Sequence, residues 1–494
     1  GMAMAHWEIQ GWMILILGWV FVPFYSRSMV YTMPEFLERR YNPQSRTILS
    51  VISLVSYVLT KVAVTVYAGG LVFQQVFGIK ELWGIDFFWI AAIGLVVLTA
   101  LYTIFGGMKS VLYTSVLQTP ILLLGSLIIL VLGFKELGGW DEMMRVCGAV
   151  TVNDYGDAMT NLIRSNDDAN FPWLGALIGS AIIGFWYWCT DQFIVQRVLS
   201  GKNEKEARRG TIFGAYLKLL PVFLFLIPGM IAFALHQKYI GAGGEGFLPM
   251  LANGTANADA AFPTLVAKLL PAGVKGLVVC GILAALMSSL ASLFNSSAML
   301  FTIDFYKRFR PETPEKKLVG IGQIATVVIV ILGILWIPIM RSVGDVLYTY
   351  LQDVQSVLAP GIAAAFLLGI CWKRTSAQGG MWGLIAGMVI GLTRLGAKVY
   401  YSNAGEVADS TFKYLFYDMN WLFFCGWMFL FCIIVVIVVS LATEAPTAEK
   451  IQGLVFGTAT KEQKAATRAS WDHWDIIHTA IILAITAAFY WYFW

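Results

Sequence analysis

A row of hydroxyl groups lies within the otherwise apolar stretch from Gly276 to Asp304 and could bind a small cation. The stretch is long enough to cross a bilayer, but hydrocarbon cannot satisfy its polar side chains. Ser288 and Ser289 follow Ala285 by one helical turn, so their oxygen atoms could form a notch of the hard ligands that Na⁺ prefers. Alternatively, the serines only bond back to carbonyl groups one turn earlier, as serines in membrane helices often do. The residue types alone leave both interpretations open.

An aromatic run precedes two polar side chains at residues 185–192, Phe-Trp-Tyr-Trp-Cys-Thr-Asp-Gln. Tyr187 and Trp188 could belong to an aromatic belt at the membrane interface. Aromatic faces also stack on the apolar faces of sugars, while Asp191 and Gln192 could bond hydroxyl groups. The run is therefore typical of either an interfacial belt or a polyol pocket.

Charged and amide side chains also occur within other apolar stretches, where they are costly and mark candidate functional sites. Glu8 and Lys218 each lie near one end of such a stretch, so Glu8 could also be interfacial and Lys218 could extend toward the membrane surface. The ninth stretch has a polar first half, which favours a function, and Ala359-Pro360-Gly361 predicts a break in its middle. Its polar residues are Asp345, Gln352, Asp353 and Gln355.

The sequence shows no pattern typical of an enzyme. Its six cysteines form no Cys-x-x-Cys pair, and His473 and His478 are wrongly spaced to ligate a metal from one helix face. The sequence also contains no nucleophile with a neighbouring base, no zinc-ligand spacing and no phosphate-binding loop. We therefore expect no catalytic residue, no enzymatic activity and no organic cofactor.

The composition assigns these residues to an all-α, multi-pass membrane protein. Of the 494 residues, 58% are hydrophobic and only 13% are charged, unlike soluble globular proteins. Gly106 and Gly107 predict a tight turn between the third and fourth apolar segments. We predict twelve spans, at residues 5–25, 48–78, 86–105, 111–134, 173–196, 210–236, 271–305, 317–340, 346–371, 379–400, 418–442 and 473–493.

The basic residues predict which helix ends face the cytoplasm. With residue 1 outside, the inner loops carry about 21 of the 34 Lys and Arg residues and the outer loops about 10. Cytoplasmic loops are enriched in this way. The densest inner clusters lie at residues 27–46, 197–209 and 307–317. We therefore expect a protein of the cell membrane with residue 1 on its outer side.

Five short runs and one aspartate make the chain resemble the sodium/solute symporter family, and within it the sodium/glucose cotransporter branch. The resemblance extends from residue 1 to about residue 442, and less clearly to the last helix. The aromatic and Lys runs favour sugar members over those that take proline, pantothenate or sialic acid. The matching residues are Tyr31–Phe36, Ala100–Gly107, Trp186–Gln192, Tyr216–Leu219, Leu286–Ser292 and Asp304.

This resemblance implies a LeuT-like core of two inverted repeats of five helices, with sugar and Na⁺ bound near the middle of the membrane. Because the family usually has fourteen spans, it also implies that the first two, including the broken first core helix, are absent from this sequence. Residues 1–371 would then form the second to tenth core helices. Residues 372–494 would form extra, peripheral C-terminal helices.

The resemblance implies a sugar site and an ion site. Glu8, Lys218 and Gln352 would bond sugar hydroxyls. Tyr187 would be the inner gate ring below the pyranose, with Trp188 beside it. For Na⁺, a carbonyl and two hydroxyl groups would come from Ala285, Ser288 and Ser289.

Two departures from the family pattern affect these expectations. Ser115 stands where many relatives have an aspartate tied to a second cation, which predicts one Na⁺ per sugar. Gly184 stands where some relatives place a polar side chain, and this leaves the identity of the sugar open.

The sequence thus predicts sodium-coupled symport of a glucose- or galactose-like hexose by alternating access. A sodium/myo-inositol symporter is an alternative, because inositol offers a similar ring of hydroxyls. A sugar sensor that uses this fold without transport is another. We expect the sugar, the sodium ion and the lipid bilayer as partners, and no nucleic acid; the oligomeric state is left open.

Overall fold

The protein is described by a computed structural model, which is mostly helical and covers residues 1–494 except 29, 31, 252–253, 344–345 and 405–407. Of residues 102, 104–112, 114–115, 117 and 341–343 it describes only the backbone. Within the described residues, eleven helical stretches are long and apolar enough to cross a membrane. They correspond to eleven of the twelve predicted spans, and a shorter apolar helix, Phe87–Leu101, corresponds to the third.

The elements follow one another along the chain in three groups. The first comprises η1 (Met2–Met4), α1 (Ala5–Glu8), α2 (Gly11–Ile16), η2 (Leu17–Phe21), α3 (Val22–Ser28), α4 (Met33–Arg40), α5 (Pro43–Ser56), η3 (Tyr57–Val62), α6 (Ala63–Phe77), β1 (Glu81–Leu82), β2 (Ile85–Asp86) and α7 (Phe87–Leu137). The second comprises α8 (Trp140–Gly148), α9 (Trp173–Gly184), η4 (Phe185–Thr190), α10 (Gln192–Leu199), α11 (Glu204–Pro221), η5 (Val222–Leu226), α12 (Ile227–Gly241), η6 (Ala258–Ala260), α13 (Ala261–Leu269), α14 (Ala272–Met299), η7 (Leu300–Tyr306) and α15 (Lys307–Phe309). The third comprises α16 (Glu315–Val343), α17 (Leu347–Cys371), α18 (Ala377–Asn403), α19 (Thr411–Lys413), η8 (Tyr414–Asp418), α20 (Trp421–Ala442), α21 (Ala448–Ile451), α22 (Lys461–Ala469) and α23 (His473–Tyr492).

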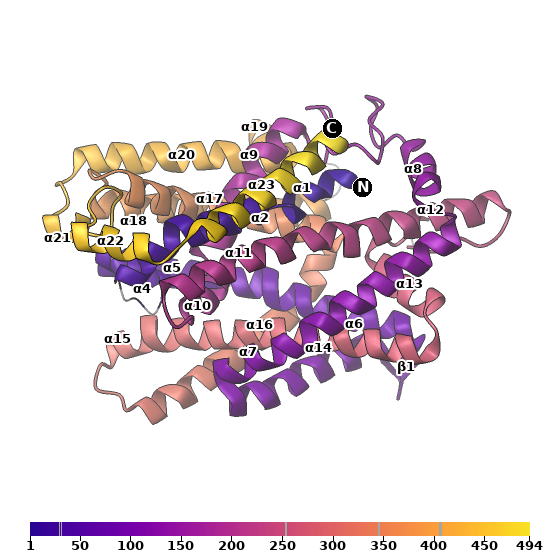
Figure 1. The fold of residues 1–494 in the computed structure, drawn as a ribbon, viewed down its shortest axis with the longest axis horizontal. Coiled ribbons are helices and arrows are strands. Elements are labelled where there is room, and N and C mark those ends of the chain that lie inside the picture. The colour runs from indigo at the N-terminus through magenta and orange to yellow at the C-terminus, as the bar shows by residue number, and fades with distance from the viewer. Residues whose placement is uncertain (29, 31, 252–253, 344–345, 405–407) are drawn as a thin grey trace.

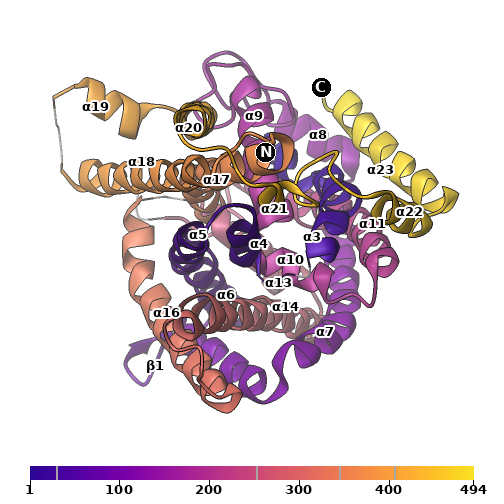
Figure 2. The same cartoon turned by 90° about the vertical axis from the view of Figure 1, so that its left-hand side faces the viewer.

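The long helices lie roughly along one common axis, so the connecting segments gather at its two ends. Figure 1 shows α4, α15, α21 and α22 at one end, and α8 and the antiparallel hairpin of β1 and β2 at the other. Seen from the first of these ends, α4 and α10 lie in the inner part of the bundle, and α7, α16, α18 and α23 lie at its rim (Figure 2). The basic loops 27–46 and 307–317 lie at that same end, which we take as cytoplasmic.

Several spans contain a π-helical turn, which places one extra residue in the turn. Such turns occur mostly as single insertions in α-helices and often at functional sites. In this chain, η3 carries Lys61, η4 carries Tyr187 and Trp188, and η5 directly follows Pro221. In the sixth span, Pro221 and Pro228 therefore flank a π-helical turn within a continuous helical path.

Helix α7 has 51 residues and no assigned break, so the prediction of two separate helices joined by a tight turn at Gly106 and Gly107 is wrong. The chain still reverses direction within it. Leu95 and Leu286 both approach Gly69, and Ile121 contacts Gly281. On α14 these two contact points are five residues apart, about 7.5 Å, whereas residues 95 and 121 of a straight α7 would be separated by about 39 Å. Helical hydrogen bonding thus continues through a sharp bend, which local glycine propensity alone does not predict.

Helix α17 continues through Pro360, so the predicted break in the ninth span is also wrong. A proline removes one helical hydrogen bond, but packing against neighbouring helices makes it tolerable in a membrane helix. Here the neighbour is α18, and a Cβ on its Gly387 would lie 2.6 Å from the Cα of Gly361. The two glycines allow the backbones to touch directly beside the proline.

This crossing gives a stability prediction. We expect Gly387→Ala to destabilise the protein by about 1–3 kcal/mol, because the added methyl group would meet backbone that no rotamer change can move. Gly396→Ala is the matched control, since it lies on the same helix and its added Cβ would have no atom within 4 Å. Thermal melting of the two purified variants measures the difference, and equal melting temperatures would contradict the predicted clash.

One run and the aspartate of the family resemblance meet at the cytoplasmic end. The Thr32 hydroxyl, in the first run, donates to Asp304 Oδ1 at 3.1 Å, and Arg46 pairs with the same carboxylate at 2.6 Å. Arg46 also pairs with Glu38 at 2.6 Å. These bonds hold the segment after the first span against the inner end of η7.

A fully buried arginine lies on α18. The sequence gives no pairing partner for Arg394, and extension to the membrane surface is the usual expectation for an Arg in a span. The structure instead buries it fully, and it donates to the carbonyl groups of Leu415 and Met419 at 3.2 and 2.6 Å. Arg394 therefore binds η8 and the residue after it to α18.

Candidate functional site

The charged residues of the first and sixth spans form a pair. Lys218 Nζ lies 2.7 Å from Glu8 Oε2, and the Tyr348 hydroxyl donates to Glu8 Oε1 at 3.1 Å. Glu8 is the last residue of the short helix α1, while Lys218 lies three residues before Pro221 and Tyr348 is the second residue of α17. Three spans distant in the sequence therefore bring an anion, a cation and a hydroxyl group together.

An aromatic ring and an amide lie beside this pair. Lys218 Nζ lies 5.7 Å from the centre of the Trp188 ring. Gln352 follows Tyr348 by one turn of α17 and is buried, and within the described residues its Oε1 has no hydrogen-bond partner. An unsatisfied buried acceptor costs about 1–3 kcal/mol, so this oxygen is suited to accept a hydrogen bond from a ligand.

A cavity leads to the pair. It has a volume of about 760 Å³, and its lining includes Glu8, Tyr348 and Asp259 among apolar residues such as Phe225 and Phe262. This size lies within the range of small-molecule sites, which are mainly apolar with a few polar groups that set orientation. The cavity could thus admit a solute of sugar size and present carboxylate and hydroxyl oxygens to it.

A second, more deeply buried ion pair lies behind the aromatic run. Lys61, from η3, pairs with Asp191, which also accepts from the Tyr57 hydroxyl at 2.9 Å and from the backbone N–H of Phe193 at 3.1 Å. The Lys61 ammonium lies 5.1 Å from the centre of the Tyr187 ring. Tyr187 therefore faces the Lys61–Asp191 pair, while its neighbour Trp188 faces Lys218.

The space beside Gly184 is filled by a polar side chain from another helix. A Cβ at Gly184 would lie 2.6 Å from Gln10 Oε1, and Gln10 Nε2 donates to the Ser180 carbonyl at 2.9 Å. In this chain an amide on the first span therefore occupies the position at which the family resemblance expects a polar group in some relatives.

The residues expected to bind Na⁺ lie on one face of α14. Ser288 is buried, Ala285 is half-buried and Ser289 is exposed. Ser289 is one turn before Ser292, whose hydroxyl accepts a hydrogen bond from Arg197 of α10. This face of α14 therefore contacts α10 at Ser292, while Gly281, on the same face about three turns earlier, contacts α7. The three residues offer hard oxygen ligands from one side only, so a complete ion site needs further donors from another element.

Two further polar residues of α14 bond to carbonyl groups of their own helix. Ser296 bonds back to the Ser292 carbonyl at 2.8 Å, and Asn295 bonds back to the Ala291 carbonyl at 3.1 Å. For these two residues the back-bonding interpretation is confirmed. In the described part of the chain, all six cysteines are free and no three His, Cys, Asp or Glu residues cluster as a metal site.

The structure brings together Glu8, Lys218 and Trp188 as one group and places Gln352 one turn from it. Tyr348 and Gln10 are additional polar residues that the sequence interpretation missed. Tyr348 could have been found from its spacing, because it precedes Gln352 by four residues and shares a helix face with it. No spacing signal pointed to Gln10. Asp345 and the side chain of Ser115 lie outside the described residues, so the prediction of one Na⁺ per sugar stays a prediction.

Comparisons with known proteins point to one family. Residues 1–387 match the family model described as the sodium:solute symporter family. A sodium/mannose cotransporter of Bos taurus is 36% identical, and the alignment covers 98% of this chain and 83% of that protein. Sodium/myo-inositol cotransporter 2 of Homo sapiens is 35% identical over 93% of this chain and 69% of that protein. Sodium/glucose cotransporter 4 of Danio rerio is 34% identical over 95% of this chain and 73% of that protein.

A solved structure has the same fold. It is the substrate-bound outward-open state of a Na⁺-coupled sialic acid symporter, with a TM-score of 0.68 and 21% sequence identity. The superposition covers 90% of this chain and 84% of that chain. The predicted LeuT-like, multi-pass helical architecture is thereby confirmed.

Proposed function

The chain belongs to the sodium:solute symporter family and is a sodium-coupled solute symporter; we propose that its solute is a glucose- or galactose-like hexose. The observation that carries this proposal is the pairing of Lys218 and Tyr348 with Glu8, since Glu8 and Tyr348 line a cavity of about 760 Å³. A carboxylate accepts hydrogen bonds, an ammonium group donates them and a hydroxyl does both. A ring of sugar hydroxyls offers the complementary donors and acceptors.

The neighbouring residues suit the other surfaces of a pyranose. Trp188 presents an aromatic face beside Lys218, and such faces can cover the C–H side of a sugar ring. The unpaired Gln352 Oε1 would accept from a further hydroxyl. Tyr187, on the other side of Trp188, would close the pocket toward the cytoplasm and open when the Lys61–Asp191 pair behind it moves.

A sodium/myo-inositol symporter is the second candidate. Inositol presents a similar ring of hydroxyls, and relatives about 35% identical to this chain are named as myo-inositol cotransporters. The position of Gln10 at Gly184 supplies an amide in place of the side chains of some relatives. The same pocket chemistry thus supports both solutes. A competition uptake experiment distinguishes a hexose carrier from an inositol carrier.

Coupling requires that Na⁺ and sugar both favour one conformation. We propose that Na⁺ bound by Ala285, Ser288 and Ser289 stabilises an outward-open state in which the sugar pocket is formed. By linkage, the sugar then raises Na⁺ affinity by the same factor. The Na⁺ gradient supplies the free energy for uptake by alternating access.

The direct test is uptake by the full-length protein in proteoliposomes. We expect labelled glucose to accumulate against its gradient when Na⁺ is imposed outside, and not when K⁺ replaces it. Unlabelled galactose should compete strongly and myo-inositol weakly. If myo-inositol competed more strongly than galactose, the proposed solute would be inositol and not a hexose. Accumulation of glucose independent of Na⁺ would contradict the coupling.

The ion site has its own test. We expect Ser289→Ala to raise the Na⁺ concentration for half-maximal uptake by about 10- to 100-fold, because an oxygen bonded to a charged group contributes about 1.5–3 kcal/mol. Ser297→Ala is the matched control on the same helix, since the Ser297 hydroxyl is buried and has no partner among the described residues. An unchanged Na⁺ dependence in Ser289→Ala would remove this residue from the ion site.

A further inference from the structure

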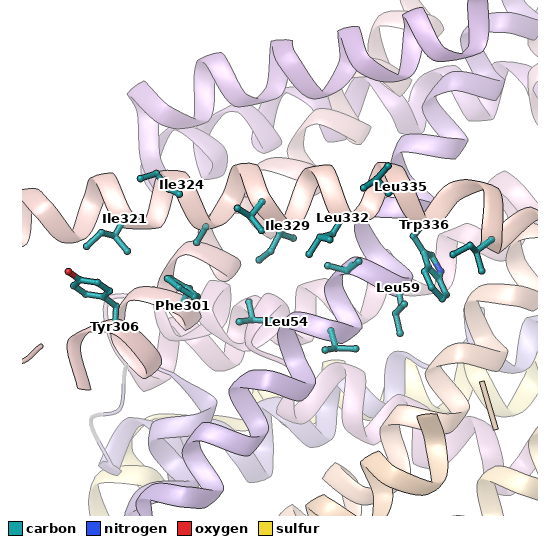
Figure 3. A pocket seen from close by; sticks show the side chains of 15 residues that line it. Leu54, Leu59, Phe301, Tyr306, Ile321, Ile324, Ile329, Leu332, Leu335 and Trp336 are labelled. Atoms are coloured by element: carbon teal, nitrogen blue, oxygen red, sulfur yellow. The ribbon is translucent and has the colours of Figure 1, made fainter. Parts of the chain in front are cut away.

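A long apolar groove lies on the outer surface of the helix bundle, apart from the sugar cavity. Helices α5 and η3 form one wall, α16 forms the other, and η7 closes one end. Its volume is about 730 Å³. Only Tyr306 and Trp336 among its lining residues carry a polar side-chain atom, and the Trp336 indole N–H is already bonded to the Tyr350 hydroxyl at 2.6 Å. Figure 3 shows Ile321, Ile324, Ile329, Leu332 and Leu335 along α16, with Leu54 and Leu59 on the opposite wall and Tyr306 at one end.

The groove lies at the depth of the membrane. Helix α16 belongs to one of the apolar spans, and its Ile324 and Leu335 side chains are 66% and 64% exposed. Exposed isoleucine and leucine on a membrane span face lipid. From Ile321 to Trp336 the groove extends about 22 Å along the helix. One leaflet contributes about 15 Å of hydrocarbon, so the groove can hold an acyl chain along its full length.

The cytoplasmic end of the groove is positively charged on both walls. On α16, Lys317 precedes Ile321 by four residues, so it continues the row of side chains that faces the groove. On α5, Thr47, Leu54 and Val58 share a face, and the Arg308 guanidinium bonds Thr47 Oγ1 and the Pro43 carbonyl. The segment 307–317, which joins η7 to α16, has five basic and two acidic residues, a net charge of +3. A cation therefore lies at the cytoplasmic end of each wall.

We propose that this groove binds an anionic phospholipid of the cytoplasmic leaflet. One acyl chain would lie between α5–η3 and α16, and the phosphate-containing headgroup would lie between Arg308 and Lys317. The Tyr306 hydroxyl lies at the same end, at the level where aromatic side chains meet headgroups (Figure 3). Basic side chains beside the cytoplasmic face of a membrane helix attract anionic lipids. Such a lipid would hold the second and eighth spans together.

Native mass spectrometry of the purified full-length protein, released from nanodiscs, tests the proposal. The nanodiscs contain phosphatidylcholine alone or mixed with phosphatidylserine. We expect the unmodified protein to retain phosphatidylserine preferentially. Arg308→Gln combined with Lys317→Gln should lower this preference by about 30-fold, because each cation near the surface contributes about fivefold. Filling the groove by Val328→Trp should remove the bound lipid of either kind.

Matched variants exclude general effects of charge and size. Lys464→Gln, an exposed residue of α22, controls for loss of cytoplasmic charge, and Val438→Trp, exposed on α20, controls for a bulky side chain on a lipid-facing helix. Leu332→Trp repeats the groove test if Val328→Trp fails to fold. Equal retention of both lipids by the unmodified protein would overturn the proposal. Retained phosphatidylserine in a folded groove-filled variant would also overturn it, as would a groove covered by a second copy of the chain, seen as a lipid-free dimer.

Discussion

Lys218→Met is expected to weaken sugar binding by about 10- to 100-fold. The change removes an ammonium donor of the proposed pocket while keeping a side chain of similar length. A hydrogen bond to a charged group contributes about 1.5–3 kcal/mol, which corresponds to this range of affinity. The loss also leaves the Glu8 carboxylate with Tyr348 as its remaining described partner. Concentration-dependent, Na⁺-driven uptake measures the effect as an increase in KM.

Lys205→Met provides the control, because Lys205 is exposed on the same helix α11. Adding Glu8→Gln to Lys218→Met completes a double-mutant cycle. Since the two groups are in contact, the double variant should lose less free energy of sugar binding than the two single variants lose in sum. An unchanged sugar affinity in Lys218→Met would exclude this residue from the pocket.

Asp191→Asn is expected to cause the largest loss of stability, about 3–5 kcal/mol. Asparagine keeps the shape of the side chain but leaves the Lys61 ammonium without its counter-charge in the membrane interior. Removing one partner of a buried ion pair costs this much because the other charge remains desolvated. We expect a lower melting temperature and little folded protein at the cell surface.

The double variant Lys61→Met with Asp191→Asn separates charge from shape. It removes both charges, and neutral replacements of a buried pair are often well tolerated. Its melting temperature should recover most of the loss, although Tyr187 would lose its cation partner and uptake would remain low. If Asp191→Asn alone melted like the unmodified protein, the pair would not be buried as described.

The positions of the spans could be predicted from the sequence because membrane helices must be long and apolar. Their internal geometry could not. Gly106-Gly107 and Pro360 are helix breakers in water, yet α7 and α17 continue through them because packing in the bundle outweighs local propensity. The π-helical turns were also not predicted, since the extra residue leaves no mark on hydropathy.

The sequence identified most residues of the candidate site, but it did not show which of them contact each other. Glu8 and Lys218 stood out because charges in a membrane span are costly, but the sequence does not reveal that they bond each other across 210 residues. Asp191 stood out beside the aromatic run, but only the fold shows that Lys61 is its partner. Tyr348 was missed because a tyrosine near the end of an apolar helix resembles an interfacial anchor.

The π-helical turns have a consequence for how this pocket can change over evolution. A single-residue deletion within η4 would restore ordinary α-helical winding and rotate every side chain before it by about 100° relative to those after it. Tyr187 and Trp188 could then exchange which ion pair they face without any change of residue type. Small insertions and deletions, as well as substitutions, are therefore a route by which this fold acquires new solute preferences.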